Sequence, residues 1–256
     1  MPDNVNVILQ LLFRWIHVVA GITWIGHLYF FNWVNAHFAK TMDGPTKKMV
    51  VPELMPRALY WFRWGAAWTW ITGVLLAGLV YYMGGALFED QVGNPVLATG
   101  LLIGALVLVV VYDLVMKSVA NILVANTIVL ALFLGLLFAL HQVGHFSGRA
   151  LYIHAGAILG TVMAFNVWMR IWPNQKRIIA AIKEGTAPDA ALVAMAGLRS
   201  RQNTFMSVPL VFFMISNHYA TVYGSPYRFA YLVVILAVGF LATRLLYNKS
   251  AKVTGF

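Results

Sequence analysis

Residues 149–172 read RALYIHAGAILGTVMAFNVWMRIW, a long apolar stretch with an arginine near each end and one histidine inside it. A helix needs about 20 such residues to cross the roughly 30 Å hydrocarbon layer of a membrane. Comparable stretches recur along the chain, and we expect spans near 8–35, 57–83, 96–116, 119–142, 149–172, 205–223 and 228–247. The sequence therefore predicts an all-α, polytopic transmembrane helical bundle of about seven spans.

The composition supports this fold class and excludes several kinds of site. Of the 256 residues, 61% are hydrophobic and only 10% are charged, whereas a soluble domain carries about 25% charged residues. The chain has no cysteine, which excludes disulfides, iron–sulfur clusters, thiolate zinc sites and covalently attached haem c. The first apolar segment lacks the pattern of a cleavable signal peptide. We expect residues 1–256 to form a single integral membrane domain.

The positions of the basic residues predict the orientation. If the N-terminus lies outside, only Arg14, Arg149 and Arg228 of the 18 basic residues fall on the outer side. Cytoplasmic loops carry an excess of Lys and Arg, so the N-terminus is predicted outside and the C-terminus in the cytoplasm. The net charge of +10 follows from this loop bias and does not indicate a nucleic-acid partner. The bacterial cytoplasmic (inner) membrane is the expected location.

This topology brings five of the seven histidines toward the outer face, from four different helices: His17, His141, His145, His154 and His218. Ionisable residues inside a bundle usually mark a pathway or a bound cofactor, and imidazole is a common ligand of haem iron. We therefore predict that His17, His154 and His218 are haem-iron ligands. His141 and His145 are weaker metal candidates, because their i, i+4 spacing chelates a metal only if the helix continues through Gly144. The alternative for each is a histidine satisfied by hydrogen bonds.

Other residues accompany these candidates. Gly21 and Trp24 share a helical face with His17, and Asn217 belongs to a polar run, Ser216 to Tyr219, that could bind a ligand or cofactor propionates. We assign all three to the cofactor site, with helix packing and an ordinary polar helix end as alternatives. Catalytic residues are not assigned.

Two further patterns favour a structural role. Asp113 and Lys117 are expected to form an i, i+4 ion pair, and the small residues Gly156, Gly160 and Ala164 are expected to form a ridge for close helix packing.

Four strings resemble a known family. They are RWIHVVAGITWIG (14–26), WFRWGAAWTWITG (61–73), YIHAGAILGTVMAFNVW (152–168) and LRSRQNTFMSVPLVFFMISNHY (198–219). In order along nearly the whole chain, they are similar to the membrane domain of bacterial membrane-bound urate hydroxylases, the urate oxidase N-terminal domain family. The first string also resembles the opening helix of other small haem-associated membrane families.

The resemblance implies a function. Family members add one more transmembrane helix and an external cytochrome c domain, which takes electrons from urate oxidation; this sequence contains no C-x-x-C-H. We therefore expect a haem-b-binding redox protein that oxidises a small substrate such as urate, or relays electrons to a separate cytochrome c or respiratory complex at the outer face. For urate, Arg149, Asn217 and His145 are the nearest outer donors. A non-catalytic accessory subunit of a respiratory complex is the alternative.

Overall fold

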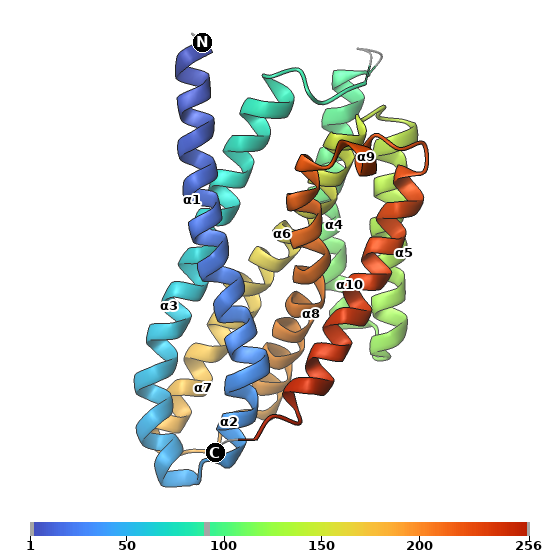
Figure 1. Cartoon of the computed structure of the whole chain (residues 1–256). Coiled ribbons are helices and arrows are strands. Elements are labelled where there is room, and N and C mark those ends of the chain that lie inside the picture. The colour runs from blue at the N-terminus through green and yellow to red at the C-terminus, as the bar shows by residue number, and fades with distance from the viewer. Residues whose placement is uncertain (1–2, 90–92, 255–256) are drawn as a thin grey trace. The chain divides into compact units, whose positions relative to one another are not determined.

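The computed structural model describes residues 3–89 and 93–254, and their regular structure is helical apart from one isolated bridge between Phe88 and Phe146. This confirms the all-α prediction. The elements are α1 (Asp3–Tyr29), η1 (Phe30–Asn35), α2 (Ala36–Thr41), α3 (Gly44–Ala77), η2 (Gly78–Tyr82), α4 (Pro95–Ser118), α5 (Ile122–Gln142), α6 (Gly148–Asn166), η3 (Val167–Ile171), α7 (Trp172–Glu184), α8 (Ala190–Ile215), η4 (Ser216–His218), α9 (Ala220–Tyr223) and α10 (Arg228–Ser250) (Figure 1).

In the described part of the chain, six helices are long and apolar enough to cross a membrane: Asn4–Thr41, Gly44–Tyr82, Pro95–Ser118, Ile122–Gln142, Gly148–Glu184 and Arg228–Ser250. The segment predicted to span at 205–223 does not form one long apolar helix. It begins inside α8, whose first half carries Arg199 and Arg201, and α8 ends at Ile215. The polar first half lowers the mean hydropathy of α8, and the turn at Ser216–His218 shortens the apolar run.

Local signals fix several helix ends. The side chain of Asn94 accepts hydrogen bonds from the backbone N–H groups of Val96 (2.9 Å) and Leu97 (3.2 Å), and Pro95 follows it at the first helical position of α4. Asn121 caps α5 in the same way. At the C-terminal end of α7, Gly185 has a φ of 78°, a left-handed conformation that glycine adopts without strain.

The described residues include three π-helical turns, of which η1 and η3 lie within otherwise continuous helices and η2 follows α3 and ends that helix at Tyr82. Such turns are rare in proteins and occur frequently at functional sites. Each changes the faces that the following side chains present, so a strict 3.6-residue period does not describe these helices.

By its contacts the chain divides into two compact units, which we describe separately. Unit 1 comprises 1–76, 163–208 and 239–256, and unit 2 comprises 77–162 and 209–238.

Unit 1 contains a buried polar network. The amide nitrogen of Asn166 donates to Oδ1 of Asn203 (2.8 Å), and the amide nitrogen of Asn203 donates to the carbonyl oxygen of Met163 (3.0 Å). Both asparagines are fully buried. The Tyr247 hydroxyl donates to Oδ1 of Asn32 at 2.9 Å. Interhelical hydrogen bonds of this kind hold helices together in an apolar medium.

Unit 2 contains the small-residue ridge. A Cβ atom added at Gly156 would lie 2.8 Å from Cε of Met214 and 3.2 Å from Cβ of Phe213. A Cβ atom added at Gly160 would likewise contact a methyl group of Leu210. The predicted packing role is therefore confirmed for both glycines, which face α8. The predicted Asp113–Lys117 ion pair is also confirmed, at 2.8 Å.

Candidate functional site

The most organised polar cluster of unit 2 begins at the π turn η2. The hydroxyl of Tyr82 lies 3.0 Å from Nε2 of His154 on α6, and Nδ1 of His154 lies 2.7 Å from the carbonyl oxygen of Ala150. A carbonyl oxygen only accepts, so Nδ1 carries the proton of the neutral ring, and Nε2 accepts from Tyr82. The backbone thus fixes the direction of the Tyr82–His154 hydrogen bond.

Aromatic rings enclose His154, which is only 4% exposed. The rings of Phe146, Tyr81 and Tyr82 approach it edge-on, with centroids 5.0, 5.8 and 5.9 Å from that of the imidazole. These contacts exclude water, so the histidine must be satisfied by the two hydrogen bonds described above.

A second part of the cluster is centred on Asn217. Its Oδ1 accepts from Nε of Arg149 and from the hydroxyl of Tyr81, both at 2.9 Å. Two donors on one atom identify that atom as the amide oxygen, so the –NH₂ group of Asn217 points away from them as a donor. The guanidinium carbon of Arg149 also lies 5.9 Å from the centroid of the Tyr81 ring. The result is a cation and an amide donor held side by side.

A cavity of about 150 Å³ adjoins this cluster. Tyr81 belongs to both, because it lines the cavity and binds Asn217. The lining residues are Tyr81, Tyr82, Gly85, Leu87, Phe88, Pro95 and Thr99. The volume is below the roughly 300–1,000 Å³ of pockets for drug-sized ligands, so the cavity suits a small molecule.

The chain between η2 and α4 is tied to the rest of unit 2. Ser147 donates from its backbone N–H to the carbonyl oxygen of Leu87 and from its hydroxyl to that of Ala86, both at 2.9 Å. Glu89 forms a two-pronged ion pair with Arg228, with both N···O distances 2.8 Å. The Arg228 guanidinium lowers the pKa of the Glu89 carboxyl. These contacts hold the cavity wall formed by Leu87 and Phe88.

His17, Gly21 and Trp24 belong to unit 1. Nδ1 of His17 lies 3.1 Å from the Thr72 hydroxyl oxygen, which itself donates to the carbonyl oxygen of Trp68. A Cβ atom at Gly21 would lie 3.9 Å from Thr69. Trp24 is buried, and its indole N–H has no hydrogen-bond partner in the described structure.

The remaining histidine candidates lie in unit 2. Helix α5 ends at Gln142, before Gly144, so the condition for i, i+4 chelation by His141 and His145 is not met. His141 stacks on Phe229, with centroids 6.1 Å apart, and His145 is exposed with a φ of 51°. His218 is exposed at the end of η4. Over residues 3–89 and 93–254, the structure contains no group of three or more His, Asp or Glu side chains that could hold a metal ion.

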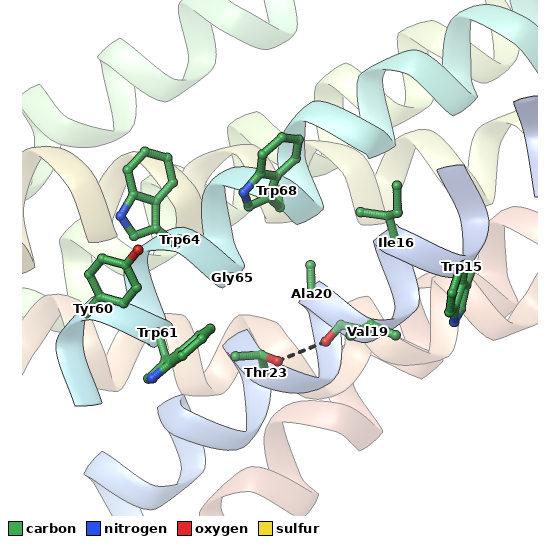
Figure 2. A pocket seen from close by; sticks show the side chains of 10 residues that line it. All are labelled: Trp15, Ile16, Val19, Ala20, Thr23, Tyr60, Trp61, Trp64, Gly65 and Trp68. Carbon is green, nitrogen blue, oxygen red and sulfur yellow. Dashed lines mark hydrogen bonds between the residues drawn. The ribbon is translucent and has the colours of Figure 1, made fainter. Parts of the chain in front are cut away.

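Unit 1 has a larger, open groove of about 720 Å³ between α1 and α3 (Figure 2). The helices cross closely at Gly65, where a Cβ atom would lie 3.0 Å from the backbone nitrogen of Trp24. Its walls are mostly aromatic and aliphatic: Trp15, Ile16, Val19, Ala20, Thr23, Tyr60, Trp61, Trp64 and Trp68. The one hydroxyl on the α1 side, Thr23, is bonded to the Val19 carbonyl. None of the predicted ligands lines this groove.

The model of one family, described as urate oxidase N-terminal, matches residues 4–49 and 42–255. The chain belongs to the urate oxidase N-terminal family. No curated protein and no solved structure gives a significant match. The resemblance deduced from the four strings is therefore confirmed at the level of the family.

In this family member, the sequence pointed to part of the unit 2 cluster. Arg149, Asn217 and His145 were predicted as the nearest outer donors for urate. The structure brings Arg149 and Asn217 into contact, whereas His145 takes no part in their hydrogen bonds. Tyr81 and Tyr82 were missed. They follow an apolar run, and the π turn that directs one toward Asn217 and the other toward His154 leaves no mark in the hydropathy pattern.

Proposed function

We propose that this protein is a membrane-bound oxidoreductase that oxidises urate or a closely related purine. Membership of the urate oxidase N-terminal family supports the reaction class. The observation that carries the assignment of the site is the contact between Arg149 and Asn217, which holds a cation and an amide donor together near a small cavity.

The chemistry of urate matches these groups. At neutral pH urate is a flat anion with carbonyl oxygens, and it is bound best by a fixed cation and by neutral N–H donors. Arg149 keeps its terminal –NH₂ groups for a ligand, because its bond to Asn217 uses only Nε. The amide –NH₂ of Asn217 lies beside it. In the proposed complex these donors bind the oxygens of the purine, and Tyr81 holds Asn217 in place.

Haem b is the proposed electron carrier, and His17 is the histidine that fits it best. The Thr72 hydroxyl gives its proton to Trp68, so it accepts the Nδ1 proton of His17 and leaves the Nε2 lone pair for a metal. The ring of His17 packs closely against Gly73, because a Cβ added there would lie 3.2 Å from Cε1 of His17. A bound haem would supply one-electron transfer between the substrate and an external acceptor.

The other predicted ligands fit less well. Nε2 of His154 already accepts from Tyr82, so it could bind iron only if this hydrogen bond were broken. His218 is exposed at the end of η4. We therefore propose His17 as a ligand and assign no second one. A separate cytochrome c or respiratory complex at the outer face of a bacterial cytoplasmic membrane is the proposed acceptor.

Two experiments on the full chain in lipid nanodiscs test the proposal. The first measures urate oxidation with a soluble cytochrome c as acceptor. We expect Arg149→Met to reduce kcat/KM by about 10- to 100-fold, the effect of losing one charged hydrogen-bond donor. Arg14→Met, at an exposed position of unit 1, is the matched control. Absence of turnover in the wild type, or equal turnover in Arg149→Met, would contradict the assignment.

The second experiment measures a reduced-minus-oxidised absorption spectrum after preparation from haem-replete cells. We expect a haem b band that is lost in His17→Ala and retained in His37→Ala. A colourless, folded wild-type preparation would exclude haem b as the carrier.

A further inference from the structure

We propose that Tyr82 and Thr99 make the 150 Å³ cavity of unit 2 a site that accepts hydrogen bonds but donates none through its hydroxyl groups. Such a cavity selects ligands by their N–H groups, and His154 is the residue that sets this preference. The proposal rests on the proposed function, because it assigns the N–H edge of the purine to this cavity.

The hydrogen of the Tyr82 hydroxyl has a fixed direction. Nδ1 of His154 must donate to the Ala150 carbonyl, so Nε2 is left as an acceptor and takes the hydrogen of Tyr82. Tyr82 therefore offers only oxygen lone pairs to anything else. Tyr82 is 41% exposed and lines the cavity, and in the proposed complex those lone pairs face the ligand.

The Thr99 hydroxyl is also limited to accepting hydrogen bonds, for a different reason. Its hydroxyl donates to the carbonyl oxygen of Pro95, one helical turn earlier, at 2.8 Å. A hydroxyl has one hydrogen and two lone pairs, so Thr99 also presents only lone pairs. The two hydroxyl groups come from separate elements, η2 and α4, and both are turned into acceptors by neighbouring protein groups.

The other walls suit a flat ring. Leu87, Phe88 and Pro95 contribute apolar surface, and among the residues that the structure describes no acidic or basic side chain lines the cavity. A ligand with N–H groups can bond to Tyr82 and Thr99 while its ring faces the apolar walls. A ligand with methyl groups at those nitrogens would leave both oxygens without a partner. Buried polar groups left unpaired produce strong discrimination between otherwise similar ligands.

The cavity and the donor cluster then have complementary roles. Arg149 and Asn217 present donors, suited to carbonyl oxygens, and Tyr82 and Thr99 present acceptors, suited to ring N–H groups. Tyr81 contacts both parts. An oxopurine such as urate carries both carbonyl oxygens and ring N–H groups, which is why we place its N–H edge at Tyr82.

The test is equilibrium binding to the full chain in lipid nanodiscs, with two pairs of probes. Urate is compared with its tetramethyl derivative, in which every ring nitrogen is methylated. Xanthine is compared with caffeine at mildly acidic pH, where both are uncharged. We expect the wild type to prefer xanthine over caffeine by about 10- to 100-fold, the cost of leaving one or two acceptors unpaired. The preference for urate over its tetramethyl derivative should be larger, because the derivative also lacks the negative charge that Arg149 binds.

Three variants identify the source of the preference. Tyr82→Phe should reduce the preference for xanthine over caffeine by about 3- to 10-fold, since one of the two acceptors is gone and Thr99 remains. His154→Leu should do the same although Tyr82 remains, because the freed hydroxyl can rotate and donate. His154→Gln should keep the preference, since its amide oxygen can accept the same hydrogen bond. Tyr152→Phe, which removes a buried hydroxyl bonded to the Arg228 carbonyl, is the matched control.

The outcomes separate this inference from the proposed function. A preference for xanthine over caffeine without urate binding or oxidation would support the cavity and contradict the proposed function. Urate oxidation with no preference in either pair would support the proposed function and contradict the role of the cavity. A preference that is unchanged in Tyr82→Phe overturns the role of Tyr82, and this variant decides the question even if His154→Leu does not fold.

Discussion

Substitution of Asn217 by aspartate should separate the stability of the site from its affinity for an anion. A carboxylate can accept the same two hydrogen bonds, from Nε of Arg149 and from the Tyr81 hydroxyl. We therefore expect the free energy of unfolding to change by no more than about 1 kcal/mol. The substitution removes the amide donor, however, and adds a negative charge. At about 6 Å and an effective dielectric constant near 20, repulsion of an anionic ligand amounts to about 3 kcal/mol, or roughly a 100-fold loss of affinity.

Asn217→Leu should give the opposite result. It removes the oxygen that accepts from both Arg149 Nε and the Tyr81 hydroxyl, and Tyr81 is only 4% exposed. One charged and one neutral hydrogen bond are lost, so the cost to stability is about 2–4 kcal/mol.

The assay for both variants is thermal unfolding in nanodiscs, followed by equilibrium binding of radiolabelled urate. Asn248→Asp, at an exposed position near the end of α10, controls for the added charge. Urate affinity in Asn217→Asp equal to that of the wild type would refute the reasoning, because the amide would then not face the ligand.

Three further predictions concern the scaffold and are checked by thermal or chemical unfolding. Arg228 lowers the pKa of the Glu89 carboxyl, so this ion pair stabilises the protein at neutral pH. Its contribution is lost as the pH falls below 4.5, the ordinary pKa of a glutamate, and through the lowered pKa of Glu89. Glu89→Gln should therefore reduce the free energy of unfolding by at most about 1 kcal/mol at pH 7 and not at all in strong acid. Asn203→Ala breaks two buried interhelical hydrogen bonds and should cost about 1–3 kcal/mol. Gly148→Ala should destabilise by about 3 kcal/mol or more, since its Cβ would lie 1.8 Å from the Tyr223 carbonyl oxygen, whereas Gly100→Ala in open space should be neutral or slightly stabilising.

The sequence predicted the helical elements because their signals are local. The expected spans at 96–116, 119–142 and 228–247 match helices to within a few residues, whereas the helices expected at 57–83 and 149–172 extend about 12 residues beyond those bounds at one end. The ion pair of Asp113 with Lys117 and the ridge at Gly156 and Gly160 followed from helical spacing alone. Hydropathy does not show that α8 starts at Ala190 and stops at Ile215, inside the segment expected at 205–223.

The candidate site was only partly predictable. Polarity in an apolar chain singled out Arg149, Asn217 and His154, but not the partners that decide their roles. Whether His154 is a ligand or an acceptor depends on the Tyr82 hydroxyl, which a π turn places at 3.0 Å. That distance depends on tertiary packing, which residue spacing does not encode.

The central claim is that the Arg149–Asn217 cluster of unit 2 binds a purine anion. The most direct test is equilibrium binding of radiolabelled urate to the wild type, Arg149→Met and Arg14→Met in nanodiscs. We expect saturable binding in the wild type and in Arg14→Met, and a loss of affinity of about 10-fold or more in Arg149→Met. Unchanged affinity in Arg149→Met, or no saturable binding in the wild type, would contradict it.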